Sequence, residues 1–201
     1  QSLYDMLEDP SQQHDIAAEN PNLVEQFGTA YAKAFEEVTQ NGTDPLPIPV
    51  GYPEVPTVRL PAHEAEPAGN VGYQEGHGWA NDWLINWTAT GDRASWQLDV
   101  AKPGRYRVQL QYSVPQTDTG ALIFAQSGEQ QLSTLIREAH DPDPLPSPDR
   151  VPRKEVYEKV WQTLDMGTLQ LEKGLQEFVI QVDEVPGAQA MELKGVILEH
   201  L

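Results

Sequence analysis

Residues 96–110 carry the clearest indication of the fold: Trp96-Gln97-Leu98-Asp99-Val100, then the turn Pro103-Gly104, then Tyr106-Arg107-Val108-Gln109-Leu110. On both sides of the turn, large apolar residues alternate with polar ones. This period of two is typical of strands that bury one face and expose the other, as in antiparallel sheets. We therefore predict two half-buried antiparallel strands here.

Similar short apolar segments continue to the C-terminus, separated by glycine and proline turns and without intervening helices. Many short strands at this spacing predict a mainly β fold and a sandwich over residues 58–201. In the last segment Leu193 and Val196 are out of phase by one residue, so Gly195 is a candidate for a β-bulge that repairs the register. The further strand candidates are residues 121–126, 130–136, 169–171, 178–182 and 193–199.

One amphipathic helix is predicted ahead of the sandwich, over residues 21–40. Asn20 suits the N-cap, Pro21 suits the first helical position, and Asn41-Gly42 ends the helix. Residues 2–7 predict a short strand or an extended segment before it. The apolar positions that recur at three- and four-residue spacing are Leu23, Val24, Phe27, Tyr31, Ala34, Phe35 and Val38.

Two proline-rich stretches organise the rest of the chain. The first predicts an extended linker over residues 43–57, between an N-terminal segment 1–42 and the sandwich. The second, residues 141–152, has strand patterns on both sides, and we interpret it as a long loop on the sandwich.

Composition excludes several classes of function. A net charge of -18, with 13 Lys and Arg against 31 Asp and Glu, argues against nucleic acid as a partner. No run of 18 apolar residues predicts a membrane span, and this stretch contains no signal peptide pattern. The absence of cysteine excludes disulfides and thiolate metal sites, and leaves the compartment open.

Aromatic residues gather in a glycine-rich segment that could stack on sugar rings. Trp83 and Trp87 alternate like strand residues, so we expect them in the core. Tyr73 and Trp79 are the better candidates for ligand binding.

A second candidate site combines an aromatic residue with a basic segment. Trp161 follows a run in which bases are concentrated in an otherwise acidic chain, and such a loop could recognise a sulfated or uronic sugar. The alternative is that the bases pair with nearby acids, Glu155 and Glu158 among them. The bases are Arg150, Arg153, Lys154 and Lys159.

The first forty residues resemble the end of the catalytic domain of arylsulfatases. The resemblance rests on Leu3-Tyr4-Asp5-Met6, Glu8-Asp9-Pro10 and the run Asp15-Ile16-Ala17-Ala18-Glu19-Asn20-Pro21. The chain departs from the family at Gln12 or Gln13, where the family has Glu, and at Asp15-Ile16, where it has Asn-Leu. The resemblance implies a secreted or periplasmic parent sulfatase with its catalytic domain in cis. The formylglycine motif of sulfatases is absent, so this chain is expected to be non-catalytic.

Residues 58–201 resemble the carbohydrate-binding modules of families 6 and 35. The resemblance rests on His63-Glu64-Ala65-Glu66 followed by the two alternating strands. It implies a jelly-roll, galactose-binding-like sandwich, a polysaccharide or oligosaccharide partner, and Trp161 as the loop aromatic that binds it. It also implies a structural calcium, with Glu64 and Glu66 as ligands and Asp99 and Glu192 as weaker candidates. Solvated carboxylates on an edge strand are the alternative.

These observations lead to one main functional hypothesis and two alternatives. The main one is a module that targets a parent sulfatase to a polysaccharide. The first alternative is a structural accessory domain that packs on the sulfatase core or mediates oligomerisation. The second is a polysaccharide lyase, for which Tyr157, His140 and Arg150 are the only residues we can nominate.

Overall fold

The computed structural model describes residues 1–43, 45–146 and 158–201. The chain forms two compact units, Gln1–Pro45 (unit 1) and Leu46–Leu201 (unit 2). No helix in the described ranges has the length and hydropathy needed to cross a membrane.

Unit 1 contains the predicted helix. A short 3-10 helix, η1 (Ala17–Glu19), precedes α1 (Pro21–Thr39), while residues 1–5 have no regular secondary structure. Asn20 occupies the N-cap position, but its side chain does not cap α1; its amide Nδ2 donates to the Ile16 carbonyl at 3.1 Å. The capping mechanism expected from the sequence is therefore wrong, although the helix start is right. No residue of α1 is buried.

Aspartate side chains fix the turns of the segment before α1. Asp15 Oδ1 accepts hydrogen bonds from the backbone N–H groups of Leu3 at 3.0 Å and Ala17 at 2.9 Å. Asp9 Oδ2 accepts from the N–H of His14 at 2.7 Å. The N–H groups of Leu3 and Ala17 lower the pKa of Asp15 below its usual value, because hydrogen bonds to a carboxylate favour the charged form.

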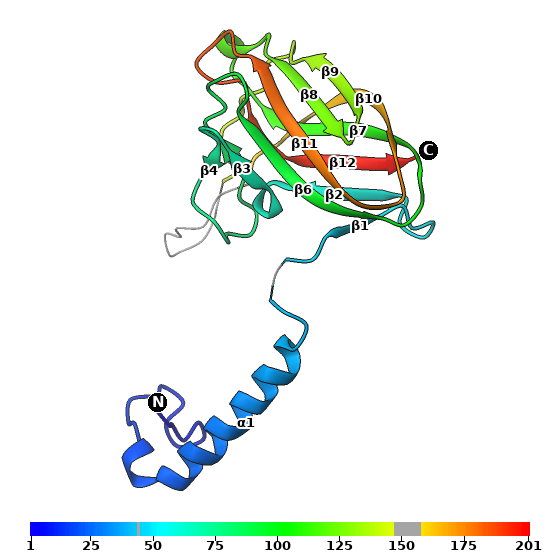
Figure 1. Ribbon diagram of the computed structural model, residues 1–201. Coiled ribbons are helices and arrows are strands. Elements are labelled where there is room, and N and C mark those ends of the chain that lie inside the picture. The colour runs from blue at the N-terminus through cyan, green and yellow to red at the C-terminus, as the bar shows by residue number, and fades with distance from the viewer. Residues whose placement is uncertain (44, 147–157) are drawn as a thin grey trace. The chain divides into compact units, whose positions relative to one another are not determined.

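Unit 2 is a sandwich of two sheets that face each other (Figure 1). Sheet 1 has the order β1-β6-β11-β8-β9, with β3 also on β6; sheet 2 has the order β10-β7-β12-β5-β4, with β2 also on β12. Sheet 1 consists of β1 (Ile48–Val50), β3 (Glu66–Ala68), β6 (Arg93–Val100), β8 (Leu122–Ser127), β9 (Gln130–Leu135) and β11 (Gly174–Glu184). Sheet 2 consists of β2 (Thr57–Pro61), β4 (Gly72–Tyr73), β5 (Leu84–Ile85), β7 (Gly104–Ser113), β10 (Gln162–Leu171) and β12 (Glu192–His200); the short helices η2 (Ala62–Glu64) and η3 (Gln116–Asp118) lie between strands.

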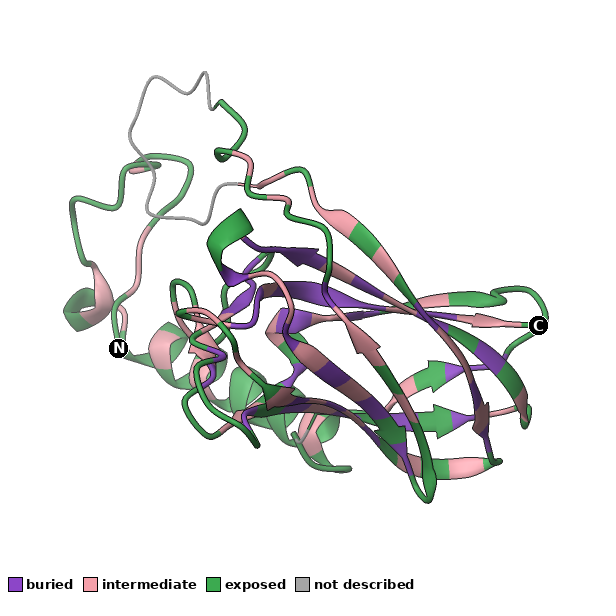
Figure 2. Cartoon of the chain, turned by 90° about the horizontal axis from the view of Figure 1, so that it is seen from above, coloured by how far each residue is buried: buried purple, intermediate pink, exposed green. Residues whose placement is uncertain are grey.

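The core lies between the inner faces of the two sheets, where the buried residues of the strands gather (Figure 2). The alternation predicted for residues 96–110 is confirmed: along β6, Trp96 and Leu98 are buried while Gln97 and Asp99 are exposed. Each buried side chain the size of Leu98 contributes about 1.5–3 kcal/mol to folding. Trp83 and Trp87 are buried as expected, at 5% and 0% exposure.

The sandwich begins earlier than the sequence pattern indicates. β1 lies within residues 43–57, predicted as a linker, yet it pairs in parallel with β6, with Ile48 opposite Leu98 and Val50 opposite Val100. Val50 is fully buried. Its place at the sheet edge tolerates Pro49, which has no N–H to donate.

The bulge predicted at Gly195 is confirmed. The pairing of β12 with β7 shifts between Leu193 and Gly195, so Lys194 is the extra residue. A Cβ at position 195 would lie 2.6 Å from the carbonyl oxygen of Leu60 in β2, which is too close for any residue but glycine. Leu193 and Val196 are both buried as a result.

Candidate functional site

Three segments of unit 2 meet in what we call the loop end: residues 74–83 between β4 and β5, residues 158–161 before β10, and the bulge residue Lys194. The rings of Trp83 and Trp161 meet edge to face, with centroids 5.3 Å apart. The Lys194 ammonium lies 5.8 Å from the Trp83 centroid and 5.7 Å from the Trp161 centroid. Cation–π contacts of this kind contribute about 0.5–2 kcal/mol each.

Two ion pairs hold these segments together. Lys194 Nζ lies 2.9 Å from Glu158 Oε2 and donates to the Asn81 carbonyl at 2.6 Å. Lys159 Nζ lies 2.7 Å from Glu192 Oε2. Lys194 is 4% exposed. A buried ammonium without oxygen partners would cost several kcal/mol, so these contacts are what allow Lys194 to lie here.

Glu158 joins the ion pairs to the aromatic pair. Its carboxylate accepts a hydrogen bond from Trp161 Nε1 and another from the backbone N–H of Lys159. Burial of Glu158 raises its pKa, but the hydrogen bonds from Trp161, Lys194 and Lys159 together outweigh burial, so the pKa lies below its usual value. The loop end therefore keeps a charged carboxylate beside a charged lysine.

A second carboxylate anchors the loop of residues 74–83. Asp82 is fully buried and accepts hydrogen bonds from the backbone N–H groups of Trp83 at 2.7 Å, Gly76 at 3.1 Å and Glu75 at 3.2 Å. The buried carboxylate thus holds the backbone of the loop in place. Trp79, near its tip, is nevertheless 40% exposed.

The aromatic candidates lie on both sides of this loop. Tyr73 precedes it, half-buried, with its hydroxyl donating to the Ala65 carbonyl at 2.5 Å and its ring edge to face with the exposed His77 at 5.6 Å. Burial of Tyr73 raises the pKa of its hydroxyl. Trp161 is half-buried against the core, and the structure brings it to Trp83.

The loop end contains a residue that sequence reasoning missed. Lys194 is the only charged residue in the run Leu193-Lys194-Gly195-Val196-Ile197-Leu198. A lysine isolated in an apolar strand is a signal that its ammonium has found buried partners. Trp83 contributes a hydrogen-bond donor that is not satisfied: its Nε1 is buried and has no hydrogen-bond partner in the part of the chain that the structure describes.

The basic candidates divide into two groups. Arg150, Arg153 and Lys154 lie outside the described residues, as does Tyr157. Lys159 is described, and it pairs with a carboxylate, as the alternative proposed, although its partner is Glu192. His140, the third lyase candidate, has its Nε2 2.6 Å from the carbonyl oxygen of Val160.

The four calcium candidates do not gather in one place in the described part of the chain. Glu64 is exposed in η2, and Glu66 is exposed in β3 opposite Ser95. Asp99 lies four residues further along β6, about 13 Å away at the usual rise per residue. Glu192 is engaged by Lys159. Across the described ranges no three His, Asp or Glu side chains gather as a metal site, so these residues do not form one calcium-binding set and the calcium stays a prediction.

Comparisons with known proteins bear on the fold. No protein-family model matches the chain, and no curated protein matches it. Among solved structures, a family 35 carbohydrate-binding module from Clostridium thermocellum superposes with a TM-score of 0.50 and 10% identity, over 72% of this chain and 98% of the module.

Two larger proteins contain a similar sandwich. A GH26-CBM35 β-(1,4)-mannanase from Podospora anserina gives a TM-score of 0.51 at 11% identity, over 72% of this chain and 28% of the enzyme. The mosquito-larvicidal Cry4Aa toxin from Bacillus thuringiensis gives 0.51 at 14% identity, over 72% of this chain and 23% of the toxin. At these identities the likeness concerns the fold alone. Unit 2 is therefore a mainly β, jelly-roll-like sandwich similar in fold to the family 35 carbohydrate-binding modules.

Proposed function

We propose that unit 2 is a non-catalytic carbohydrate-binding module whose binding site is the loop end. The observation that carries this proposal is the exposed Trp79 on a loop that Asp82 anchors from inside. An aromatic ring held in place can pack against the C–H groups of a sugar, and a fixed loop loses little conformational entropy on binding. His77, exposed on the same loop, offers ring nitrogens to sugar hydroxyls.

The module would serve to target a larger enzyme. Holding a catalytic domain near a polysaccharide raises the local substrate concentration without any new contact at the catalytic centre. The family 35 module and the GH26-CBM35 mannanase, both similar in fold, support this ligand class. A structural calcium with Glu64 and Glu66 among its ligands is part of the proposal.

We further propose that the parent enzyme is an exported sulfatase, secreted or periplasmic, and that the glycan is sulfated or uronic. The resemblance of the first forty residues supports the sulfatase parent, and Asp9 of the Asp9-Pro10 pair fixes a turn there by accepting a hydrogen bond from the His14 N–H at 2.7 Å. The basic residues close to Trp161 in sequence support an anionic glycan.

A glycan-array screen of the full chain, with calcium and with a chelator, tests the proposal. The array includes sulfated galactans, glycosaminoglycans and neutral polysaccharides. We expect Trp79→Ala to weaken binding about tenfold or more, since a lost aromatic platform removes about 1.4 kcal/mol. Tyr52→Ala, at an aromatic residue of similar exposure outside the loop end, is the matched control and should bind like the wild type.

The alternative is a structural accessory domain. The observation that favours it is that Trp161 is half-buried and that its Nε1 is already bonded to Glu158, which leaves less of it for a ligand. A folded chain that binds no glycan on the array would sink the carbohydrate-binding proposal and leave this role.

A further inference from the structure

Strand β9 (Gln130–Leu135) is the last strand of sheet 1, and its free edge has no partner strand in the described ranges (Figure 1). Such an edge presents a row of backbone N–H and C=O groups with which another strand can pair. We propose that β9 is an interaction surface whose partner is β9 of a second copy of this chain. The two strands run antiparallel across a two-fold axis, so the interface is isologous and joins the two copies of sheet 1. The proposal holds whether or not unit 2 binds a glycan.

The other strands that pair on one side only carry features that oppose such pairing. β1 and β4 are three and two residues long, and β2 and β3 each contain a proline. β10 has a β-bulge between Asp165 and Gly167. Short strands, prolines and bulges are means by which proteins protect sheet edges. β9 has none of these features: it has six residues, no proline and no charge, and its register with β8 is unbroken.

The backbone groups of β9 point toward β8 and away from it in turn. Ile136, directly after β9, donates its N–H to the Ala121 carbonyl at 3.0 Å and accepts at its own carbonyl from the Gly120 N–H at 2.7 Å. Because residues along an antiparallel strand alternate in this way, the even-numbered residues of β9 direct their N–H and C=O groups to β8. The residues that direct them to the free edge are Gln131, Ser133 and Leu135.

A register centred on Ser133 matches these groups between two copies. Ser133 then lies opposite Ser133 of the second copy, and Gln131 lies opposite Leu135 on each side of it. Each of these three pairs exchanges two backbone hydrogen bonds, which gives about six in all. The three side chains lie on the outer face of sheet 1, away from the core, because Leu132 between them packs against the core.

Charge favours this register over its neighbours. It places Glu129, which precedes β9, opposite Arg137, which follows β9, once at each end of the paired strands. Both side chains are exposed, and among the residues that the structure describes neither takes part in an ion pair. Opposite charges directly across two strands stabilise the pairing, and like charges destabilise it. A register shifted by two residues would lose both contacts.

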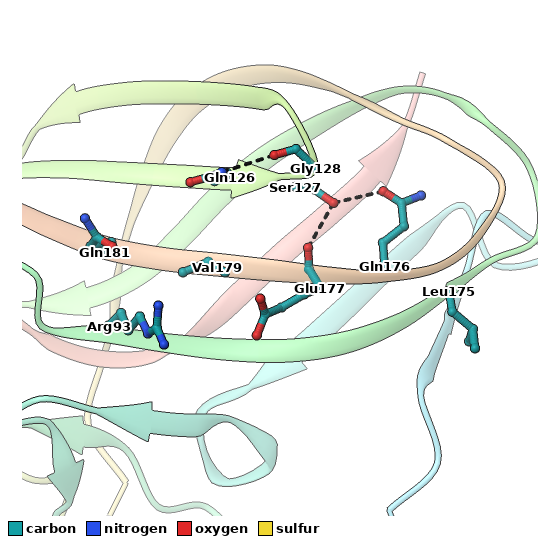
Figure 3. A pocket seen from close by; sticks show the side chains of 9 residues that line it. All are labelled: Arg93, Gln126, Ser127, Gly128, Leu175, Gln176, Glu177, Val179 and Gln181. Carbon is teal, nitrogen blue, oxygen red and sulfur yellow. Dashed lines mark hydrogen bonds between the residues drawn. The ribbon is translucent and has the colours of Figure 1, made fainter.

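The turn between β8 and β9 fixes the backbone at Glu129 (Figure 3). Gln126 Nε2 donates to the Gly128 carbonyl at 3.1 Å, and Ser127 Oγ donates to the side-chain oxygen of Gln176 at 2.9 Å. Gly128 has a φ of 57°, a left-handed conformation that glycine adopts without steric cost. Because this turn is already ordered, its backbone loses little conformational entropy when a second copy binds.

Sedimentation velocity of the full chain, at concentrations up to about 1 mM, tests the proposal. We expect the wild type to show a concentration-dependent equilibrium between monomer and dimer. Ser133→Lys places two ammonium groups opposite each other and should raise the Kd of the dimer about tenfold or more. Gln97→Lys makes the same charge change at an exposed position of the central strand β6, and as the matched control it should leave the Kd within about twofold.

Charge reversal at the two ends of β9 tests the register. Glu129→Arg and Arg137→Glu should each raise the Kd about tenfold or more, because two attractive pairs become two repulsive ones. Glu129→Arg also makes the net charge of -18 less negative, which by itself would strengthen association, so a weaker dimer reports the local contact. An equal mixture of the two variants should dimerise like the wild type, since each chain then meets an opposite charge at both ends.

Contrary results are equally clear. A chain that stays monomeric over the whole concentration range overturns the proposal. So does a dimer whose Kd is the same in Ser133→Lys, Glu129→Arg and Arg137→Glu, because that dimer uses another surface, such as the exposed apolar side chains of α1. Two charge variants that remain monomeric when mixed overturn the register. Circular dichroism checks that each variant is folded, and if Ser133→Lys is not, the mixture decides, since its two substitutions lie outside β9.

Discussion

The loop end and the outer face of sheet 1 are built on opposite principles. At the loop end the polar groups satisfy one another: the buried Lys194 pairs with the partly exposed Glu158, and the buried Asp82 accepts hydrogen bonds from three backbone N–H groups. On the outer face the polar groups project from paired strands, and their positions depend on register alone. Stability and site geometry are therefore coupled at the loop end and largely separate on the sheet. Four measurements test this difference.

Asp82→Ala should have the largest effect. It leaves three N–H groups without their acceptor. That of Trp83 is buried, and an unsatisfied buried group costs about 1–3 kcal/mol, while those of Glu75 and Gly76 are part-buried and regain some of the loss from water, so we expect about 3 kcal/mol in total. Urea unfolding followed by near-ultraviolet circular dichroism measures it. Asp99→Ala, an exposed carboxylate on the outer face, is the control and should change the free energy of unfolding by less than about 0.5 kcal/mol. Equal effects of the two substitutions would show that the loop end is no more dependent on its polar contacts than the outer face.

Lys194→Met should cause the second-largest loss in the free energy of unfolding. It removes a buried ammonium and leaves Glu158 and the Asn81 carbonyl without that partner; because Glu158 is 42% exposed, water recovers part of the loss and we expect about 2 kcal/mol. The same unfolding experiment applies, with the exposed Lys173→Met as control. An unchanged midpoint for Lys194→Met would show that the ion pair does not hold the loop end.

The third measurement is the pH dependence of Glu158→Gln. The folded state lowers the pKa of Glu158, so its carboxylate contributes stability that is fully present above the unfolded pKa, about 4.3, and is lost as pH falls through the lower folded value. The difference in free energy of unfolding between wild type and variant should therefore shrink below about pH 4. A difference that stays constant from pH 7 to pH 3 would contradict the charged carboxylate.

Gln181→Ala should have the smallest effect on stability. Its side chain projects from a strand on the outer face, so we expect a change within about 0.5 kcal/mol. Thermal unfolding of the variant beside Gln109→Ala measures this. A loss of more than about 1 kcal/mol would show that the Gln181 amide stabilises the fold, as the polar groups of the loop end do.

Local periodicity was enough to predict most of the fold. The alternation in β6 and β7, the helix α1 and the bulge at Gly195 all follow from residues close together in sequence. The pairing of β1 did not follow, because a three-residue strand broken by a proline carries no periodic signal. Its partner β6 lies about fifty residues away, and only burial of Val50 reveals the pairing.

The candidate site was less predictable because it depends on contacts across the chain. The exposure of Trp79 and the burial of Trp83 could be weighed from spacing alone. The clustering of Trp161 with Lys194 could not, since it requires the register of β10 and β12 against β7 and the extra residue at the bulge. Likewise, Glu66 lies in β3 and Asp99 in its partner β6, but their separation along β6 is visible only once the register is known, with Glu66 opposite Ser95.

The parallel pairing of β1 has a mechanical consequence. Any tension on the chain at residue 46 reaches the sandwich first through β1, which is held by only three paired residues and by the backbone hydrogen bond from Ala101 N–H to the Val50 carbonyl at 2.9 Å. The next strand, β2, pairs with β12 over five residues. Under load β1 would therefore detach first and lengthen the segment before the sandwich. The rest of the sandwich, in which β12 pairs with β2 and β7, would stay folded.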